Sequence, residues 1–224
     1  MIVLVCLESP EPSRASRAAL SIARRFAGTA QIVALSAGGP VASASLDMAR
    51  RSGAHRVIHL DEPALDRADF FTLGMVLAEA ARHIGATLVI AGERSDDEGQ
   101  GLVPAAVAHH LGAPIVARVQ DVESSLATPN AVVLTVRAGG RKNRIEMALP
   151  LVLSTPPAPI AANDAAIVSH ASLPSVQTMT FARLGLDHSR VVPRPDLLGT
   201  RVPLSAPRIQ YKSFDEVVEM LLRR

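Results

Sequence analysis

The residues best suited to chemistry lie in one loop-like stretch, residues 92–101, which read Gly-Glu-Arg-Ser-Asp-Asp-Glu-Gly-Gln-Gly. Gly99 and Gly101 would let backbone N–H groups approach a ligand closely, and a helix after them would offer its positively polarised end to a phosphate. Asp97 could accept hydrogen bonds from a ribose hydroxyl or an adenine amino group. The same residue types also form ordinary turns and cap helices, so both interpretations stay open.

Two further stretches have the composition of binding loops. Residues 7–13 read Leu-Glu-Ser-Pro-Glu-Pro-Ser and residues 36–40 read Ser-Ala-Gly-Gly-Pro, each directly after a short apolar run. In open parallel sheets, ligands bind beyond the carboxyl ends of the strands, where loops lead into helices. We therefore expect the three stretches to meet at one edge of a sheet.

The other candidate residues carry less information. Cys6 lies in an apolar run, which favours a buried, unreactive thiol over a nucleophile. His109 and His110 are adjacent on an expected helix and point about 100° apart, so they cannot share a metal ion. The carboxylates at 96–98 could bind a cation or form a solvated turn. The sequence contains no Walker A, G-x-S-x-G or H-E-x-x-H motif, and we predict neither a metal site nor a catalytic residue.

These stretches must be positioned by the elements around them, and the first 120 residues alternate between short apolar runs and longer amphipathic ones. Residues 2–7, 31–36, 56–60 and 87–91 are nearly continuously hydrophobic, as in strands that are covered on both faces. Leu73, Val76, Leu77, Ala80, Ala81 and Ile84 share one helical face. Gly53 and Gly112 stand where helices would end. The pattern predicts a parallel sheet with helical crossovers.

After Pro114 the pattern changes. Residues 115–119, 131–137 and 144–153 are strand-like, and Gly139-Gly140 predicts a hairpin turn, so we expect antiparallel additions to the parallel sheet. Residues 156–207 are irregular and rich in Pro, Ala and Ser, and Ser213 and Glu216 form a capping box for a final helix. We expect an α/β domain over 1–155 and an extended C-terminal arm over 156–224, whose terminal helix packs on a partner subunit.

The composition excludes several classes of protein. The chain has 224 residues with 23 basic and 21 acidic side chains, one Tyr and no Trp, whereas nucleic-acid binders usually show a basic stripe with stacking aromatics. One cysteine cannot form an internal disulfide. The N-terminus lacks the features of a signal peptide, and no apolar run approaches the ~20 residues that span a bilayer. We expect a cytoplasmic protein without membrane insertion.

Several short motifs follow one another along the chain. They are GAHRVIHL at 53–60, GERSDDEGQGLVPA at 92–105 followed by LGAP at 111–114, VRAGG at 136–140, ALPLVL at 148–153, SLP at 172–174 and LGLD at 184–187. In this order they resemble the beta subunit of electron transfer flavoproteins. The second motif aligns without gaps on that family's G-R-Q-A-I-D-x-D-x-G-Q-V-G-P signature.

The resemblance implies an adenine-nucleotide alpha-hydrolase-like three-layer sandwich and an electron carrier, not an enzyme. It implies an alpha subunit that holds most of the FAD, and AMP or a second FAD in this chain. Electrons would pass from a flavin-dependent dehydrogenase to a quinone reductase or another acceptor. Carried over by position, the residues that bind the cofactor would be Cys6, Ser9, Pro10, Ala37, Asp97, Glu98, Gly99, Gln100, Gly101, Leu102, Val103, Pro104 and Ala105.

The resemblance also implies that Leu173 docks the partner dehydrogenases, although an ordinary turn would explain this residue too. The sequence departs from the family where Ser9 replaces an Asn, where Leu102 and Ala105 replace Gln and Pro, and where 176–180 carries no charge. Two other classes fit the first half of the chain. A stand-alone nucleotide-binding module of the universal-stress type would need no hairpin after residue 120. An ATP pyrophosphatase would need an aspartate that residues 36–40 lack.

Overall fold

The computed structural model describes residues 1–8, 11–26, 28, 30–38, 43–94, 101–157 and 173–193. The chain divides into two compact units, Met1–Arg194 and Pro195–Arg224, and the second lies outside the described residues. The expected terminal helix at 213–224 lies there as well. The division of the chain near residue 155 stays a prediction.

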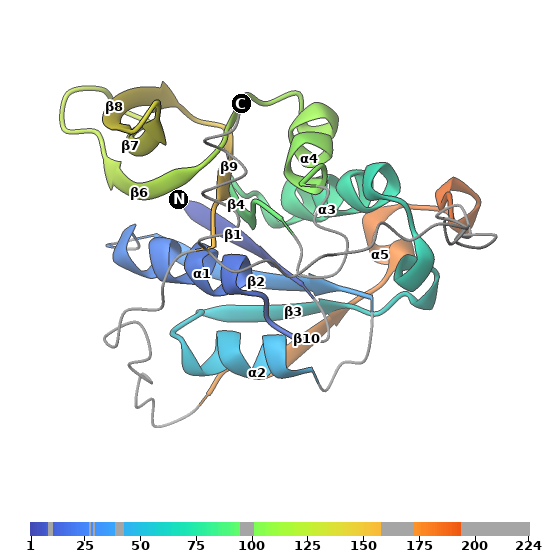
Figure 1. Ribbon diagram of the computed structural model, residues 1–224. Helices are drawn as coiled ribbons and strands as arrows, with labels where there is room; N and C mark the ends of the chain where they lie inside the picture. The colour runs from blue at the N-terminus through green and yellow to red at the C-terminus, as the bar shows by residue number, and fades with distance from the viewer. Residues whose placement is uncertain are drawn as a thin grey trace, which may run out of the picture. The chain divides into compact units, whose positions relative to one another are not determined.

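A parallel sheet of seven strands forms the centre of the first unit (Figure 1). Its spatial order is β10-β3-β2-β1-β4-β9-β5, and every neighbouring pair is parallel. The strands are β1 (Ile2–Leu7), β2 (Gln31–Ala37), β3 (Arg56–Leu60), β4 (Leu88–Gly92), β5 (Ile115–Val116), β9 (Leu151–Thr155) and β10 (Val176–Met179). The expected parallel sheet is therefore confirmed.

Helices cover both faces of this sheet, which gives three layers. Val3 and Val5 of β1 belong to one hydrophobic core with α1 (Arg14–Phe26) and α2 (Ala44–Arg51). Leu4 and Cys6 belong to the opposite core, with α3 (Phe70–Ile84), α4 (Val103–Leu111) and the short α5 (Phe181–Leu184). Because side chains alternate along a strand, the apolar run of β1 supplies both cores. Among the described residues, 3₁₀ turns also lie at Pro63–Arg67 and His188–Arg190.

A second, antiparallel sheet contains β6 (Val119–Ser124), β7 (Ala131–Ala138) and β8 (Arg141–Ala148) in that spatial order. The expected hairpin turn lies between β7 and β8, where Gly139 and Gly140 have φ of 57° and 75°. Positive φ at both central residues is the requirement of a type I′ turn, which favours glycine. Val122 and Leu134 of this sheet join the core around α1.

The arrangement of these later strands corrects the expected boundaries. Residues 144–153 are two strands, because β8 ends at Ala148 and β9 begins at Leu151 after Pro150, which has no N–H to donate. The apolar β9 enters the parallel sheet between β4 and β5, while the charged β8 stays outside it. Residues 115–119 divide in the same way at Arg118, whose φ is 62°. The antiparallel strands thus form their own sheet and are not added to the parallel one.

One strand was not expected from the sequence. β10 lies within the segment whose composition appeared irregular, yet it pairs in parallel with β3 at the edge of the main sheet. Gln177 and Thr178 in its middle are exposed. Four residues that alternate weakly in polarity give little periodic signal. Pairing with β3 therefore determines that these residues form a strand.

Candidate functional site

The three expected binding loops begin side by side. β1 lies between β2 and β4, and its last residues align with theirs: Leu7 with Ser36, and Cys6 with Ala91. Since all three strands are parallel, their carboxyl ends share one edge of the sheet. We call the described residues that begin or end these loops (7, 8, 36–38, 92–94 and 101–105) the rim.

The first loop of the rim leads into a capped helix. The Ser13 hydroxyl accepts a hydrogen bond from the Ser16 backbone N–H (3.0 Å) and donates one to Glu8 Oε1 (2.8 Å). The Glu8 N–H donates to Ser16 Oγ (3.2 Å). A serine at this position is a typical N-cap, because it satisfies an N–H group that has no partner within the helix. The entry into α1 is therefore fixed by side chains that are themselves buried, since Ser13 and Ser16 are 2% and 1% exposed.

Glu8 also connects this loop to its two neighbours. The Ser45 hydroxyl in the first turn of α2 donates a hydrogen bond to the Glu8 carbonyl oxygen. A Cβ atom at Gly92 would lie 2.8 Å from Ala15 Cβ and 3.5 Å from Glu8 Oε1, so only glycine lets α1 approach the end of β4 this closely. Glu8 was not among the residues expected to bind a ligand. The serines at 13 and 16, three residues apart at a helix start, are the signal that could have pointed to it.

The second loop contributes a buried hydroxyl without a partner. Ser36 is 0% exposed, and no hydrogen-bond partner for its Oγ occurs among the described residues. After Ala37, the N–H of Gly38 donates to the Leu60 carbonyl (3.1 Å), and φ at Gly38 is 69°. A Cβ at Gly38 would lie 2.7 Å from Asp66 Oδ1. The loop therefore leaves the sheet in a conformation that favours glycine.

The third loop closes on itself at Gly101. φ at Gly101 is 69°, and a Cβ there would lie 2.9 Å from the Glu93 carbonyl oxygen. The two described ends of the loop are thus in contact. The described close approach at Gly101 is to the chain's own backbone, and its expected approach to a ligand stays a prediction. The residues between them that were expected to bind a nucleotide, Asp97, Glu98, Gly99 and Gln100, lie outside the described residues, as do Ser9 and Pro10.

The start of α4 suits a phosphate-bearing ligand. Leu102 is the N-cap residue and makes no side-chain capping hydrogen bond, Pro104 lies in the first turn, and that turn has no acidic residue. N–H groups in the first turn of a helix lack intrahelical acceptors, and the helix end is positively polarised. Val103 and Ala105 therefore offer backbone donors without a negative charge nearby on the same turn. Backbone donors at the start of a helix can bind an anionic group such as a phosphate.

His59 of β3 lies next to Ser36 of β2 in the strand register. It is 0% exposed, and neither ring nitrogen has a hydrogen-bond partner among the described residues. Burial lowers the pKa of His59, and the carboxylates of Asp61 and Asp66 oppose this shift in part. The imidazole is therefore neutral at pH 7, and sequence analysis did not select it as a candidate.

Cys6, His109 and His110 pack within the described fold, and the cofactor contact that the resemblance implies for Cys6 stays a prediction. Burial raises the pKa of the Cys6 thiol to about 12, which confirms a buried and unreactive thiol. His109 and His110 pack on Phe71 of α3, with ring centroids 5.6 Å and 4.4 Å from the phenyl ring. Within the described ranges, no group of three or more His, Cys, Asp or Glu side chains could hold a metal ion. No helix in that part of the chain is long and apolar enough to cross a membrane.

Leu173, expected to dock partner proteins, lies half-buried just before β10. The carbonyl of the next residue, Pro174, accepts a hydrogen bond from Arg50 Nε of α2 (2.8 Å). This contact fixes the backbone beside Leu173 to a helix of the first unit. The docking role of Leu173 stays a prediction.

Comparisons with known proteins identify the family of the chain. A comparison with curated proteins found no match. The model of the family described as "Electron transfer flavoprotein domain" matches residues 3–183, which contain the whole rim, the antiparallel sheet and β10. Members of this family bind flavin as FAD, carry electrons and are not enzymes in their own right, and they function with partner subunits and dehydrogenases. The chain therefore belongs to the electron transfer flavoprotein family.

Proposed function

We propose that this chain is the beta subunit of an electron transfer flavoprotein that acts in the cytoplasm. It would pair with an alpha subunit that makes most contacts to the redox-active FAD. The pair would accept electrons from a flavin-dependent dehydrogenase and pass them to a quinone reductase or another acceptor. Membership of the family is the observation that carries this proposal.

The rim supports a second part of the proposal, an adenine nucleotide bound by this chain. The ligand would be AMP, or a second FAD if the protein divides electron pairs between two acceptors. The first turn of α4 would hold the phosphate through the N–H groups of Val103 and Ala105. The Ser36 hydroxyl lacks a partner in the described structure and would gain one if the ligand or its bound water reached it.

Bound FAD would supply the redox chemistry, so this chain would need no acid, base or nucleophile of its own. Its residues would position the cofactor and shield it from water. Glu8, with its hydrogen bonds to α1 and α2, would keep the first loop in place against its neighbours. The buried cores under the rim would exclude water from below.

The antiparallel sheet weighs against a stand-alone nucleotide-binding module of the universal-stress type. Such a module would need no hairpin beyond residue 120, yet β6, β7 and β8 are present and lie within the family match. The loop after β2 also lacks the aspartate that an ATP pyrophosphatase requires. No structural observation favours either alternative.

Co-expression with an alpha subunit tests the proposal. The purified complex should contain the two chains in equal amounts, and extraction should release one FAD and one AMP, or two FAD, per complex. A colourless chain that purifies as a stable monomer and ignores every alpha subunit offered would overturn it.

A pair of matched variants tests the nucleotide at the rim in the same preparation. Gly101→Ala should displace Glu93 and reduce the AMP content at least tenfold while the FAD remains. Gly112→Ala is the control, because φ there is 65° at the other end of α4 but a Cβ would meet nothing within 4 Å. If both variants retain AMP equally, the rim is not the nucleotide site.

A further inference from the structure

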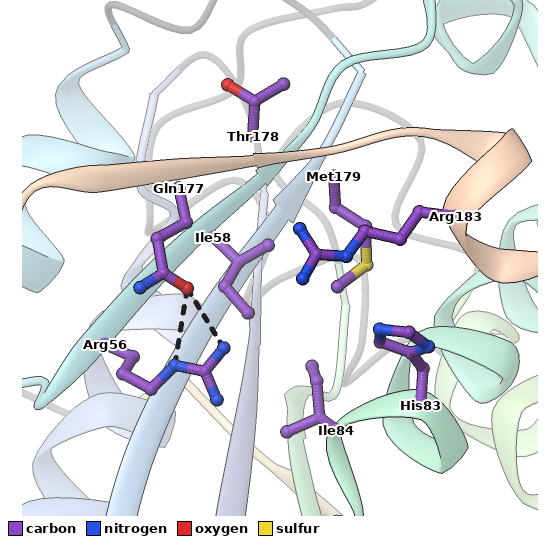
Figure 2. Close-up of a pocket in the computed structure, with 8 residues that line it drawn as sticks. All are labelled: Arg56, Ile58, His83, Ile84, Gln177, Thr178, Met179 and Arg183. Carbon is purple, nitrogen blue, oxygen red and sulfur yellow. Dashed lines mark hydrogen bonds between the residues drawn. The ribbon is translucent and has the colours of Figure 1, made fainter.

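A pocket of about 110 Å³ lies between β3, β10, the end of α3 and α5 (Figure 2). Its position differs from that of the rim. Arg56, which lines it, is the first residue of β3, whereas the rim is at the carboxyl ends of the parallel strands. The described lining residues are Arg56, Ile58, His83, Ile84, Gln177, Thr178, Met179 and Arg183.

Three basic side chains from three different elements line this pocket. Arg56 comes from β3, His83 from the last turn of α3 and Arg183 from α5, and Figure 2 shows their charged or polar ends directed toward the same space. None of the described lining residues is acidic. In the described part of the chain, no carboxylate pairs with Arg56, His83 or Arg183.

Gln177 of β10 holds one of these groups in place. Its Oε1 accepts hydrogen bonds from Arg56 Nε (3.3 Å) and Nη2 (3.0 Å), shown as dashed lines in Figure 2. This leaves Arg56 Nη1 without an acceptor among the described residues. The Arg183 guanidinium also lines the pocket (Figure 2). The two guanidinium groups are therefore available as donors to one ligand.

Arg56 and Arg183 line the same pocket, so an anion in it would be attracted by two guanidinium groups. Guanidinium groups match paired phosphate oxygens in geometry, and charge-assisted hydrogen bonds of this kind are the strong ones. A space of about 110 Å³ can admit an ion of the size of phosphate.

We propose that this pocket binds a small oxyanion of the phosphate class. The anion bridges β3, α3 and α5. Because α5 follows β10 directly in the chain and Gln177 of β10 bonds Arg56, the anion also stabilises the edge strand β10, which otherwise pairs with β3 alone in the sheet. This proposal does not depend on the nucleotide at the rim, because the two sites share no residue.

Titration of the full chain with inorganic phosphate tests the pocket, by calorimetry in a low-salt buffer that contains no phosphate. We expect saturable binding of one phosphate, weakened about tenfold by Arg183→Gln and by Arg56→Gln. The control is Arg141→Gln, which removes the same charge from the exposed start of β8 and should change the affinity less than twofold. Unfolding temperatures without phosphate verify that each variant is folded.

A second titration, with AMP at saturating concentration, identifies the source of the anion. If phosphate binds with unchanged affinity, the pocket takes a free anion. If AMP displaces phosphate and Arg183→Gln weakens AMP as well, the pocket takes the phosphate group of a nucleotide. The proposal is overturned if phosphate does not saturate, or if Arg141→Gln weakens binding as much as Arg183→Gln does.

Discussion

Two buried polar side chains lie on adjacent strands, Ser36 in the rim and His59 next to it in β3, and both lack hydrogen-bond partners among the described residues. A buried polar group without a partner costs about 1–3 kcal/mol. The two residues therefore reduce the stability of the fold at the point where we propose that a ligand binds. Such local costs are typical of functional sites.

His59 should make the stability of the protein depend on pH. Because burial lowers its pKa in the folded state, the unfolded chain binds a proton first, near pH 6.5, and the free energy of unfolding falls as the pH drops below that value. Between pH 7.5 and 5.5 this histidine should lower the free energy of unfolding, by less than about 1.4 kcal/mol. Urea unfolding at the two pH values measures the loss.

The variant His59→Gln should show a smaller loss over the same pH range, because glutamine does not titrate. His110→Gln should reduce it separately, since burial also lowers the pKa of His110, with a smaller contribution from His109. Comparing the change with pH, and not the absolute stability, removes any constant cost of the substitutions. Identical changes in the wild type and in His59→Gln would contradict a buried, neutral His59.

Among single residues, glycines that form turns were easier to predict than residues whose importance depends on contacts with distant parts of the chain. Gly101 and the pair at 139–140 could be predicted because positive φ favours glycine and the sequence shows glycine directly. His59 could not, because its importance comes from Ser36, more than 20 residues away in sequence. For Glu8, the serines at 13 and 16 could indicate its contact with α1, but its contact with Ser45 could not be predicted for the same reason. Only the fold brings these pairs together.

At the scale of elements, α3 and α4 approach each other closely at one glycine. A Cβ at Gly74 of α3 would clash with Ala106 Cβ and lie 2.9 Å from the Ala106 carbonyl carbon. Both helices belong to the core on one face of the sheet. The position of α4 therefore depends on the absence of a side chain at Gly74 of α3. The same holds for the first turn of α4, which we propose holds a phosphate.

Gly74→Ala should destabilise the protein by about 1–3 kcal/mol through overpacking, although alanine favours the helix by about 1 kcal/mol. Ala106→Gly removes the methyl group on the opposite side, so the double variant should recover part of the loss. The free energies of unfolding of the two single variants and the double variant form a cycle that measures this coupling. We expect a coupling of about 1 kcal/mol, whereas purely additive effects would contradict the close contact.

Elements with strong patterns could be predicted and those without them could not. The six apolar positions of 73–84 marked α3, and the apolar runs marked the strands that are covered on both faces. The break at Pro150 was overlooked because residues 144–153 remain strand-like on both sides of it. β10 was missed because its four residues gain their structure from pairing with β3.

At the scale of the whole first unit, the two sheets share one core. Leu134 of β7 is 0% exposed and belongs to the same hydrophobic cluster as Val3 and Val5 of β1. The Arg25 guanidinium of α1 also pairs with Asp121 of β6 at 3.4 Å. Because one hydrophobic cluster contains residues of both sheets, we expect the antiparallel sheet and the main sheet to unfold together.

Leu134→Ala tests this expectation. Truncation of a fully buried leucine costs about 2–5 kcal/mol. If the unit is cooperative, hydrogen exchange should show amides of β1 losing as much protection as amides of β7. Val133→Ala, on the less buried side of β7, should cost clearly less. Loss of protection confined to β7 and β8 would show that the small sheet opens by itself.

The entry and exit of the antiparallel sheet are neighbours, since Ile115 of β5 pairs with Val152 of β9. The chain therefore leaves the main sheet after β5 and returns to it at β9. Residues added at the turn between β7 and β8 would lengthen this segment without shifting the register of β5 or β9. Gly139 and Gly140 have open space where a Cβ would lie. A fluorescent label or an affinity peptide spliced between them would report on this protein in a living cell and leave every rim residue in its native sequence.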